Sequence, residues 1–443
     1  MKKIYLIAPL VVILVIIGIT AIKVINTQDP STQIADDITE ALGSEAVETI
    51  SDTVEYKGEI DMSSYMESVG LPVPSGSHGD LSAEVLGKSE ADNGTKLEYS
   101  TEKLSFLAVG DNLIHSSVFS DALEIGGGEK YIFDSMYENV AEPIRNADLS
   151  FINQESPIAG EEFAPSNYPM FNTPVEMGDT LLGLGFDIIS IANNHMLDKF
   201  EKGYRNHIDF WSSKPVTLIG GYRNSEDYEN IRVVEKNGIS IALLAYTYGT
   251  NGMSLPNGSE MVIPLINEKT IVRHITAAKK KADVVMVSIH WGDEGTFTPN
   301  QQQRRLAQLM ADNCVDVVLG HHSHTIQPIE WYERPDGKKT LVAFSLSNFM
   351  SAQEKPMNML AGMLTFDLEQ ISDADTVVTN VLFTPTVTYY NNSWRGFKLY
   401  FLKDYTQELH SSARCSKFEP DSSYYTNTVK KVIDSDFLPE YFK

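Results

Sequence analysis

Short apolar runs alternate with amphipathic stretches through the middle of the chain. Runs of this length, rich in Val, Ile and Leu and separated by helical patterns, are typical of parallel strands that are covered on both faces. The pattern therefore predicts an α/β domain with buried parallel strands. The predicted strands are 104–109, a strand that ends at Gln154, 187–192, 284–289 and 315–319.

After Gly320 the pattern becomes rich in strands. Pro335, Asp336 and Gly337 form a turn signal between the first two of these strands, as in a hairpin. We expect two packed mixed β-sheets flanked by helices, an αββα sandwich, to hold both halves. The later predicted strands are 325–333, 340–344, 360–366, 376–383 and 397–401.

Polar residues stand where the predicted strands end. Ligands of α/β proteins gather beyond the carboxyl ends of the strands, and we expect these ends to lie along one sheet. Carboxylate, amide and imidazole ligands together suit Mn, Fe or Zn, so the pattern predicts a site for one or two divalent ions. The candidate metal ligands are Asp111, Glu155, Asn194, His290, His322 and His324.

Each candidate has a simpler interpretation when it is taken alone. Asp111 would serve as a helix cap, and Glu155 as a solvated loop carboxylate. Asn194 would adopt a turn conformation, and His290 would be a buried core histidine. The three histidines at 321, 322 and 324 have no common packing explanation, so the set as a whole favours a metal site.

His195 and Asp198 are the candidate catalytic residues. His195 follows Asn194 directly and is placed to act as a general acid toward a leaving group. Asp198, three residues later, would orient the imidazole ring through its other nitrogen. The alternative is that Asp198 caps a helix that begins near Lys199.

The N-terminal region predicts a membrane anchor. Residues 4–22 carry no charge, follow Lys2 and Lys3, and are long enough to span a bilayer. No small-residue cleavage site follows, so we expect an uncleaved single-pass anchor over 1–26. The lysines before the span place the N-terminus inside and the remaining chain outside the cell membrane.

Three further segments are expected after the anchor. Residues 27–103 contain 17 acidic residues and 4 lysines, which is about half of the formal net charge of −25, and predict a flexible acidic stalk. Residues 104–403 form the α/β domain, and 404–443 a helical extension.

The domain is itself acidic and has no large basic patch. This excludes nucleic acid as a partner, and the negative charge would repel a polyanion at long range. Cys314 is expected to be a small buried residue of an apolar helix rather than half of a disulfide with Cys415.

Six motifs between Leu104 and Ser351 resemble the CapA family of poly-γ-glutamate capsule biosynthesis proteins, whose fold is similar to that of calcineurin-like metallophosphoesterases. They are GDNLIH, NQE, ANNHMLDKFEKG, HWGDE, GHHSHTIQPIE and SLSNF, in this order. The resemblance implies that Asp111 is the first metal-binding aspartate and that Glu155 replaces the metal-bridging acid. It also implies that Asn194 and His195 form the Asn-His motif and that His290 is the lone histidine of the pattern. His322 and His324 would be the closing His-x-His.

Two departures from the metallophosphoesterase pattern bear on this comparison. Asp111 is followed by Asn112 and Leu113 instead of the usual Asp-x-His, and the bridging acid is the longer Glu155. His115 lies two positions too late to replace the missing histidine, so it is interpreted as a loop or supporting residue.

The resemblance implies a membrane-anchored, extracytoplasmic, metal-dependent hydrolase-like protein of poly-γ-glutamate synthesis or export. The partners that it implies are the lipid bilayer, other membrane components of a poly-γ-glutamate synthase complex and an anionic polymer substrate. Two alternatives stay open. One is a metallophosphoesterase that acts on a phosphate ester or a cell-envelope polymer, and the other is a non-catalytic assembly factor.

Overall fold

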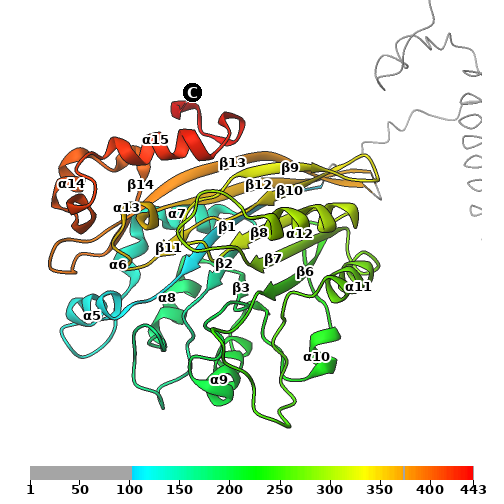
Figure 1. The fold of residues 1–443 in the computed structure, drawn as a ribbon, viewed down its shortest axis with the longest axis horizontal. Helices are drawn as coiled ribbons and strands as arrows, with labels where there is room; N and C mark the ends of the chain where they lie inside the picture. The colour runs from blue at the N-terminus through cyan, green and yellow to red at the C-terminus, as the bar shows by residue number, and fades with distance from the viewer. Residues whose placement is uncertain (1–101, 373–374, 443) are drawn as a thin grey trace, which may run out of the picture. The chain divides into compact units, whose positions relative to one another are not determined.

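The computed structural model describes residues 102–372 and 375–442, which contain two β-sheets (Figure 1). The strands of the eight-stranded sheet are β1 (Lys103–Asn112), β2 (Leu149–Gln154), β3 (Ile188–Ser190), β4 (Thr217–Ile219), β11 (Asn348–Met350), β12 (Leu360–Ser372), β13 (Asp375–Tyr389) and β14 (Lys398–Phe401). Their order is β14-β13-β12-β1-β2-β3-β4, and β11 pairs with β1. Neighbours from β1 to β4 are parallel, while β12, β13 and β14 are antiparallel to their neighbours.

The six-stranded sheet has the order β5-β6-β7-β8-β10-β9. Its strands are β5 (Arg232–Lys236), β6 (Ile239–Thr247), β7 (Val284–His290), β8 (Val317–His321), β9 (Ile329–Glu333) and β10 (Lys339–Ala343). The four central strands are parallel, and the two edge strands are antiparallel.

The α-helices lie around the two sheets (Figure 1). They are α5 (Ser116–Ile125), α6 (Asp134–Tyr137), α7 (Ala141–Asn146), α8 (Glu176–Leu184), α9 (Phe200–Ser212), α10 (Ser225–Glu229), α11 (Glu268–Ala278), α12 (Gln301–Asp312), α13 (Pro356–Met359), α14 (Gln407–Ser412) and α15 (Ser423–Val432). Single 3₁₀ turns are η1 (Glu138–Val140), η2 (Leu402–Asp404), η3 (Arg414–Lys417), η4 (Ser435–Phe437) and η5 (Glu440–Phe442). The prediction of two mixed sheets flanked by helices is confirmed.

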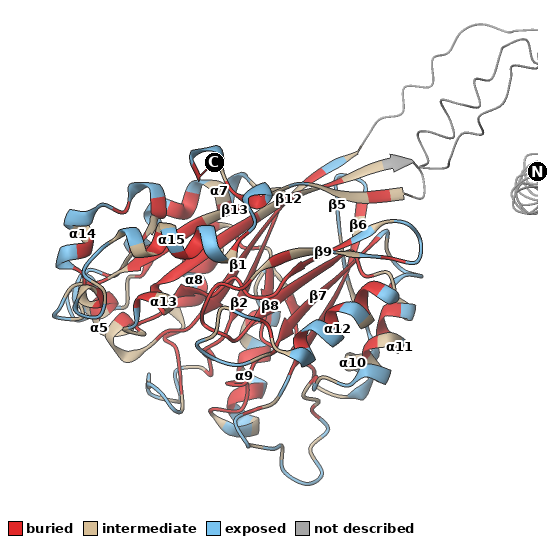
Figure 2. Ribbon diagram, turned by 45° about the horizontal axis from the view of Figure 1, so that its top comes forward, coloured by how far each residue is buried: buried red, intermediate tan, exposed pale blue. Residues whose placement is uncertain are grey.

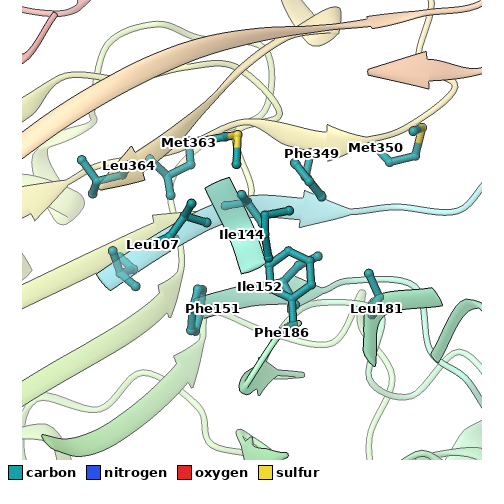
Figure 3. Packing of buried hydrophobic residues seen from close by; sticks show 14 of the residues in the cluster. Leu107, Ile144, Phe151, Ile152, Leu181, Phe186, Phe349, Met350, Met363 and Leu364 are labelled. Carbon is teal, nitrogen blue, oxygen red and sulfur yellow. The ribbon is translucent and has the colours of Figure 1, made fainter. Parts of the chain in front are cut away.

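The central strands bury both faces, which explains their continuous apolar sequence. In β6, Leu243 faces the core between the two sheets, whereas its neighbour Leu244 faces a second core beneath α11 and α12. Figure 2 shows the central strands, such as β2, β7 and β8, buried along their lengths, while α11 and α12 expose their outer sides. Figure 3 shows part of the larger core cluster closely, with Leu107 of β1, Ile144 of α7 and Phe349 of β11 among its members.

Several predicted boundaries need correction. β8 begins two residues later than expected and runs on to His321, and β9 occupies only the end of 325–333. β12 and β13 are longer than predicted, because they pair with each other over most of their lengths. Cys314 lies beyond the end of α12 with φ of 61° and is not in the helix; both cysteines are free.

The C-terminal segment packs on the same core as the rest of the domain. Tyr425 and Val429 of α15 belong to the core cluster that also contains Val387 of β13. Within 102–372 and 375–442 no helix is long and apolar enough to cross a bilayer. The predicted span 4–22 and the predicted stalk up to residue 101 lie outside these residues, whereas Lys103, placed at the end of the stalk, is the first residue of β1.

Candidate metal centre

The candidate ligands come together at the ends of five strands. Asp111 is the second-last residue of β1, and Glu155 follows β2. His290 is the last residue of β7. The remaining candidates lie in the loops after β3 and β8, at Asn194, His322 and His324. The expectation that these ends belong to one sheet is wrong: β1, β2 and β3 are in the first sheet and β7 and β8 in the second, and the packing of the two sheets brings their ends to one place.

Two glycines allow the strands that carry ligands to approach their neighbours closely. A Cβ on Gly110 would lie 1.8 Å from the carbonyl oxygen of Ser347, and a Cβ on Gly320 would lie 2.1 Å from that of Phe344. The amide of Asp111 donates to the same Ser347 oxygen at 2.8 Å. Only glycine fits at these positions, one residue before Asp111 and two before His322.

The loop after β8 is held in an uncommon backbone conformation. His322 has φ of 93° and His324 has φ of 53°, both in a region that residues other than glycine rarely adopt. The His322 amide donates to Asp111 Oδ2 at 3.2 Å, and Asn358 Nδ2 donates to the His324 carbonyl at 2.8 Å. Strain of this kind costs on the order of 1–3 kcal/mol and is typical of sites where side-chain direction matters.

The distances between donor atoms fit metal coordination. Two atoms bound at about 2.1 Å to one ion lie roughly 3–3.5 Å apart. Asn194 Oδ1 lies 2.9 Å from His290 Nε2, which lies 3.6 Å from Glu155 Oε1. His324 Nε2 is 3.8 Å from the same Glu155 oxygen. Three groups have ligand atoms within 4.8 Å of one another: Glu155, His290 and His322; Asp111, Glu155 and His324; and Glu294, His322 and His324.

Several buried polar atoms of the site have no hydrogen-bond partner, and a bound cation would interact with them instead. Both carboxylate oxygens of Glu155 are buried without a hydrogen bond, as are the Nδ1 atoms of His290 and His322. Burying a carboxylate without a donor is costly. Glu155 belongs to two of the three groups, and the family resemblance implies the place of the bridging acid for this residue. The cluster is thus compatible with divalent metal binding.

The pKa shifts of the buried residues are also compatible with metal binding. Burial lowers the pKa of His290 well below its usual value and lowers that of His322 to about 3, so both rings are in the neutral form that binds metals. Burial raises the pKa of Glu155 well above its usual value, and the nearby Asp111 charge raises it further.

His324 and Asp111 form the charged part of the cluster. Burial opposes both charges, but Glu155 and Asp111 raise the pKa of His324 to about 9. Burial alone would raise the pKa of Asp111, but the neighbouring His321 and His324 side chains hold it well below its usual range. A divalent cation would take over the positive charge that His324 contributes here.

Supporting amides orient the ligands. His324 Nδ1 donates to Asn348 Oδ1 at 2.9 Å, which leaves Nε2 facing Glu155. Asn153 Nδ2 donates to Asp111 Oδ1 at 2.8 Å, and Asn194 Nδ2 donates to Asn251 Oδ1 at 3.1 Å. Sequence reasoning did not assign these supporting residues. Asn153 and Asn348 lie in the NQE and SLSNF motifs, whereas nothing in the sequence distinguishes Asn251.

Asp198 forms a pair with His195. Asp198 Oδ2 lies 2.8 Å from His195 Nδ1 and also accepts from the Phe171 amide at 2.8 Å. Helix α9 has Lys199 as its N-cap, with no side-chain cap, so the capping alternative for Asp198 does not hold. The ring of Phe171 meets the edge of His195 at a centroid distance of 4.8 Å. The His195 ring is therefore fixed in direction, with Nδ1 engaged.

Three other side chains complete the surroundings. His321 is buried, with its ring stacked on Phe151 and its Nδ1 3.3 Å from Asp111 Oδ1, without a hydrogen bond. His115 belongs to none of the three groups of ligand atoms, and burial lowers its pKa to about 4. Glu294, in the HWGDE motif, is an exposed member of a ligand group that sequence reasoning missed.

Comparison with known proteins gives a family match. The model of the family "Bacterial capsule synthesis protein PGA_cap" matches residues 105–353. The PGA biosynthesis protein CapA of Bacillus subtilis (strain 168) is 30% identical over 272 residues, which cover 58% of this chain and 65% of the relative. The capsule biosynthesis protein CapA of Bacillus anthracis is 28% identical over 262 residues, which cover 57% of this chain and 61% of that protein. The matches thus span less than two thirds of these relatives.

Solved structures are more distant. The NAD nucleotidase NadN of Haemophilus influenzae has a TM-score of 0.40 at 12% identity, covering 77% of this chain and 57% of its own. A phosphatase from Mycoplasma pneumoniae has a TM-score of 0.39 at 14% identity, covering 64% and 94%. Nothing about activity follows from scores this low.

Proposed function

The chain belongs to the PGA_cap family of bacterial capsule synthesis proteins, and we propose that it acts as a membrane-anchored, extracytoplasmic, metal-dependent hydrolase in poly-γ-glutamate synthesis or export. The observation that carries this proposal is the buried Glu155 carboxyl group, whose two oxygens have no hydrogen-bond donor and which shares ligand groups with His290, His322 and His324. A hydrolytic metal centre needs such a set of ligands beside a proton donor, and His195 with Asp198 supplies the donor.

In this proposal one or two ions of Mn, Fe or Zn are held by the clustered residues. Glu155 would be a ligand of both ions if two are bound, because it belongs to two of the ligand groups. The proposed ligands are Asp111, Glu155, Asn194, His290, His322 and His324. A bound divalent ion lowers the pKa of a coordinated water and polarises the scissile group.

His195 carries the proton in the proposed reaction. Its Nδ1 is engaged by Asp198, so Nε2 is the atom that donates a proton to the leaving group. Asp198 is itself fixed by the Phe171 amide, and this prevents rotation of the ring. The same geometry serves a phosphate ester or an amide, so the bond that is cleaved has to be identified by assay.

The proposed site of action is the outer face of the cell membrane. Support comes from the charge-flanked apolar run 4–22 and the acidic segment 27–103, which would act as a spacer. The proposed partners are the bilayer, which the anchor would enter, and other membrane components of a poly-γ-glutamate synthase complex. The proposed substrate is an anionic polymer.

Topology is tested by protease treatment of intact cells that express the full chain. We expect the domain after residue 103 to be released, because the lysines before the span keep the N-terminus inside. A C-terminal epitope should disappear from blots of intact cells, while a cytoplasmic marker protein stays intact. Protection of the epitope in cells whose surface is accessible would contradict the proposed orientation.

Activity is tested with the full chain in detergent, on p-nitrophenyl phosphates and on poly-γ-glutamate. We expect hydrolysis of one substrate class that stops on removal of metal with EDTA and returns when Mn²⁺ or Zn²⁺ is added, because the metal that these ligands would hold would bind the reacting water. Release of p-nitrophenol and shortening of the polymer on gels are the readouts. Full metal content without turnover of either class would favour a non-catalytic assembly factor.

A further inference from the structure

Glu294 belongs to a ligand group on the solvent side of the cluster. Its carboxylate lies with the ring nitrogens of His322 and His324 within 4.8 Å, and its side chain is exposed while both histidines are buried. His322 and His324 each also belong to one of the two groups that contain Glu155. We propose that Glu294 is a further metal ligand, which closes the centre from the solvent side. This inference rests on the proposed metal-dependent function.

The loop that carries Glu294 is attached on both sides of it. Asp293 Oδ2 accepts from Asn300 Nδ2 at 2.8 Å, and Asn300 is the capping residue of α12. The Gly295 amide donates at 2.8 Å to the carbonyl of Ser323, which lies between the two histidines. Residue 294 is therefore held over the histidine pair by contacts that do not involve its own side chain.

The groups that would meet the ion are free to do so. Among the described residues, the Glu294 carboxylate forms no hydrogen bond or ion pair, unlike Asp293 beside it. The Nδ1 atom of His322 is buried and also has no partner. A carboxylate oxygen and imidazole nitrogens at this spacing are ligands that a borderline divalent cation such as Zn²⁺ accepts.

The position of Glu294 also indicates how the centre opens to solvent. Glu294 and His324 both line a pocket of about 540 Å³, whose other walls include Lys355 and Phe418. Glu294 thus lies where the cluster meets this pocket, on the side that is open to solvent. A ligand at this place would determine how tightly an ion on the solvent side of the cluster is bound.

The test compares two glutamates of the same pocket by Co²⁺ binding to the full chain. Glu294→Gln should weaken the binding of one Co²⁺ by about 10-fold or more, the range seen when groups supporting a metal are lost. It should also change the visible absorption of bound Co²⁺, because a ligand is lost. Glu354→Gln is the matched control: Glu354 lines the pocket and accepts from Arg414 Nε at 2.7 Å, but belongs to none of the ligand groups.

The outcomes separate this inference from the proposed function. If the wild type binds no Co²⁺, the proposed function fails. If the wild type binds Co²⁺ and Glu294→Gln matches Glu354→Gln in affinity and spectrum, the ligand role of Glu294 is overturned and the centre stands. Loss that is confined to Glu294→Gln, with an intermediate loss in Glu294→Asp, supports ligation over a general effect of charge.

Discussion

Replacing His195 with Ala is expected to lower turnover by about 10²–10⁴-fold while metal content and fold stay as in the wild type. The reason is geometric: His195 is held by Asp198 through Nδ1 and belongs to none of the ligand groups. Asp198→Asn should lose less, since the ring remains and only its orientation and tautomer are disturbed. The measurements are kcat on the substrate class that is hydrolysed, metal content by elemental analysis and thermal unfolding.

A buried histidine elsewhere provides the control for this prediction. His274 lies on α11, in contact with the Tyr246 hydroxyl and away from the candidate ligands, so His274→Gln should leave kcat unchanged. In cells, polymer production that survives His195→Ala but is lost with His322→Ala would show that the site binds or organises without acid catalysis. The assembly-factor hypothesis would then be preferred.

Changing His322 and His324 together to Ala is expected to remove at least one metal ion per chain. Each of the three ligand groups contains at least one of these two residues, so no group keeps its full set. Water does not replace imidazole ligands without a large loss of affinity. Elemental analysis after dialysis measures the loss.

Unfolding measurements give a second readout of the same double variant. A ligand at about 1,000 times its dissociation constant adds about 4 kcal/mol to the free energy of unfolding of the wild type. Added metal should therefore raise the melting temperature of the wild type and have little effect on the double variant. When EDTA is present to bind the metal, the wild type and the double variant should no longer differ in this response.

His321→Ala is the matched control, since it removes the same kind of ring from the adjacent position at the end of β8, and His321 belongs to none of the ligand groups. Asp111 would still accept from Asn153 Nδ2 and from the His322 amide. We expect the metal content of this variant to equal that of the wild type. Full metal content in the double variant, or an equal loss in His321→Ala, would reject the ligand assignment.

Much of the α/β architecture was determined by the sequence alone. The runs near 104–109 and 284–289 are apolar except at Ser105 and Ser288, because β1 and β7 are covered on both faces, and such runs are recognisable without coordinates. Asp111 lies one glycine beyond the first run and His290 directly after the second, so both were recognisable as polar residues at strand ends. The turn at 335–337 was equally local, since Gly337 adopts φ of 80° between β9 and β10.

Only the tertiary structure decided which groups meet. Asp198 lies closer in sequence to the start of α9 at Phe200 than to His195, yet its Oδ2 contacts His195 Nδ1 and accepts from the Phe171 amide. That the ligands come from two sheets depends on how the sheets pack, and apolar periodicity reports burial without reporting the partner. Glu294 follows no strand directly and is brought to the cluster by the bond from Gly295 to Ser323. Local patterns encode the strands and the residues at their ends, whereas contacts between segments far apart in the sequence are set by packing of the whole domain.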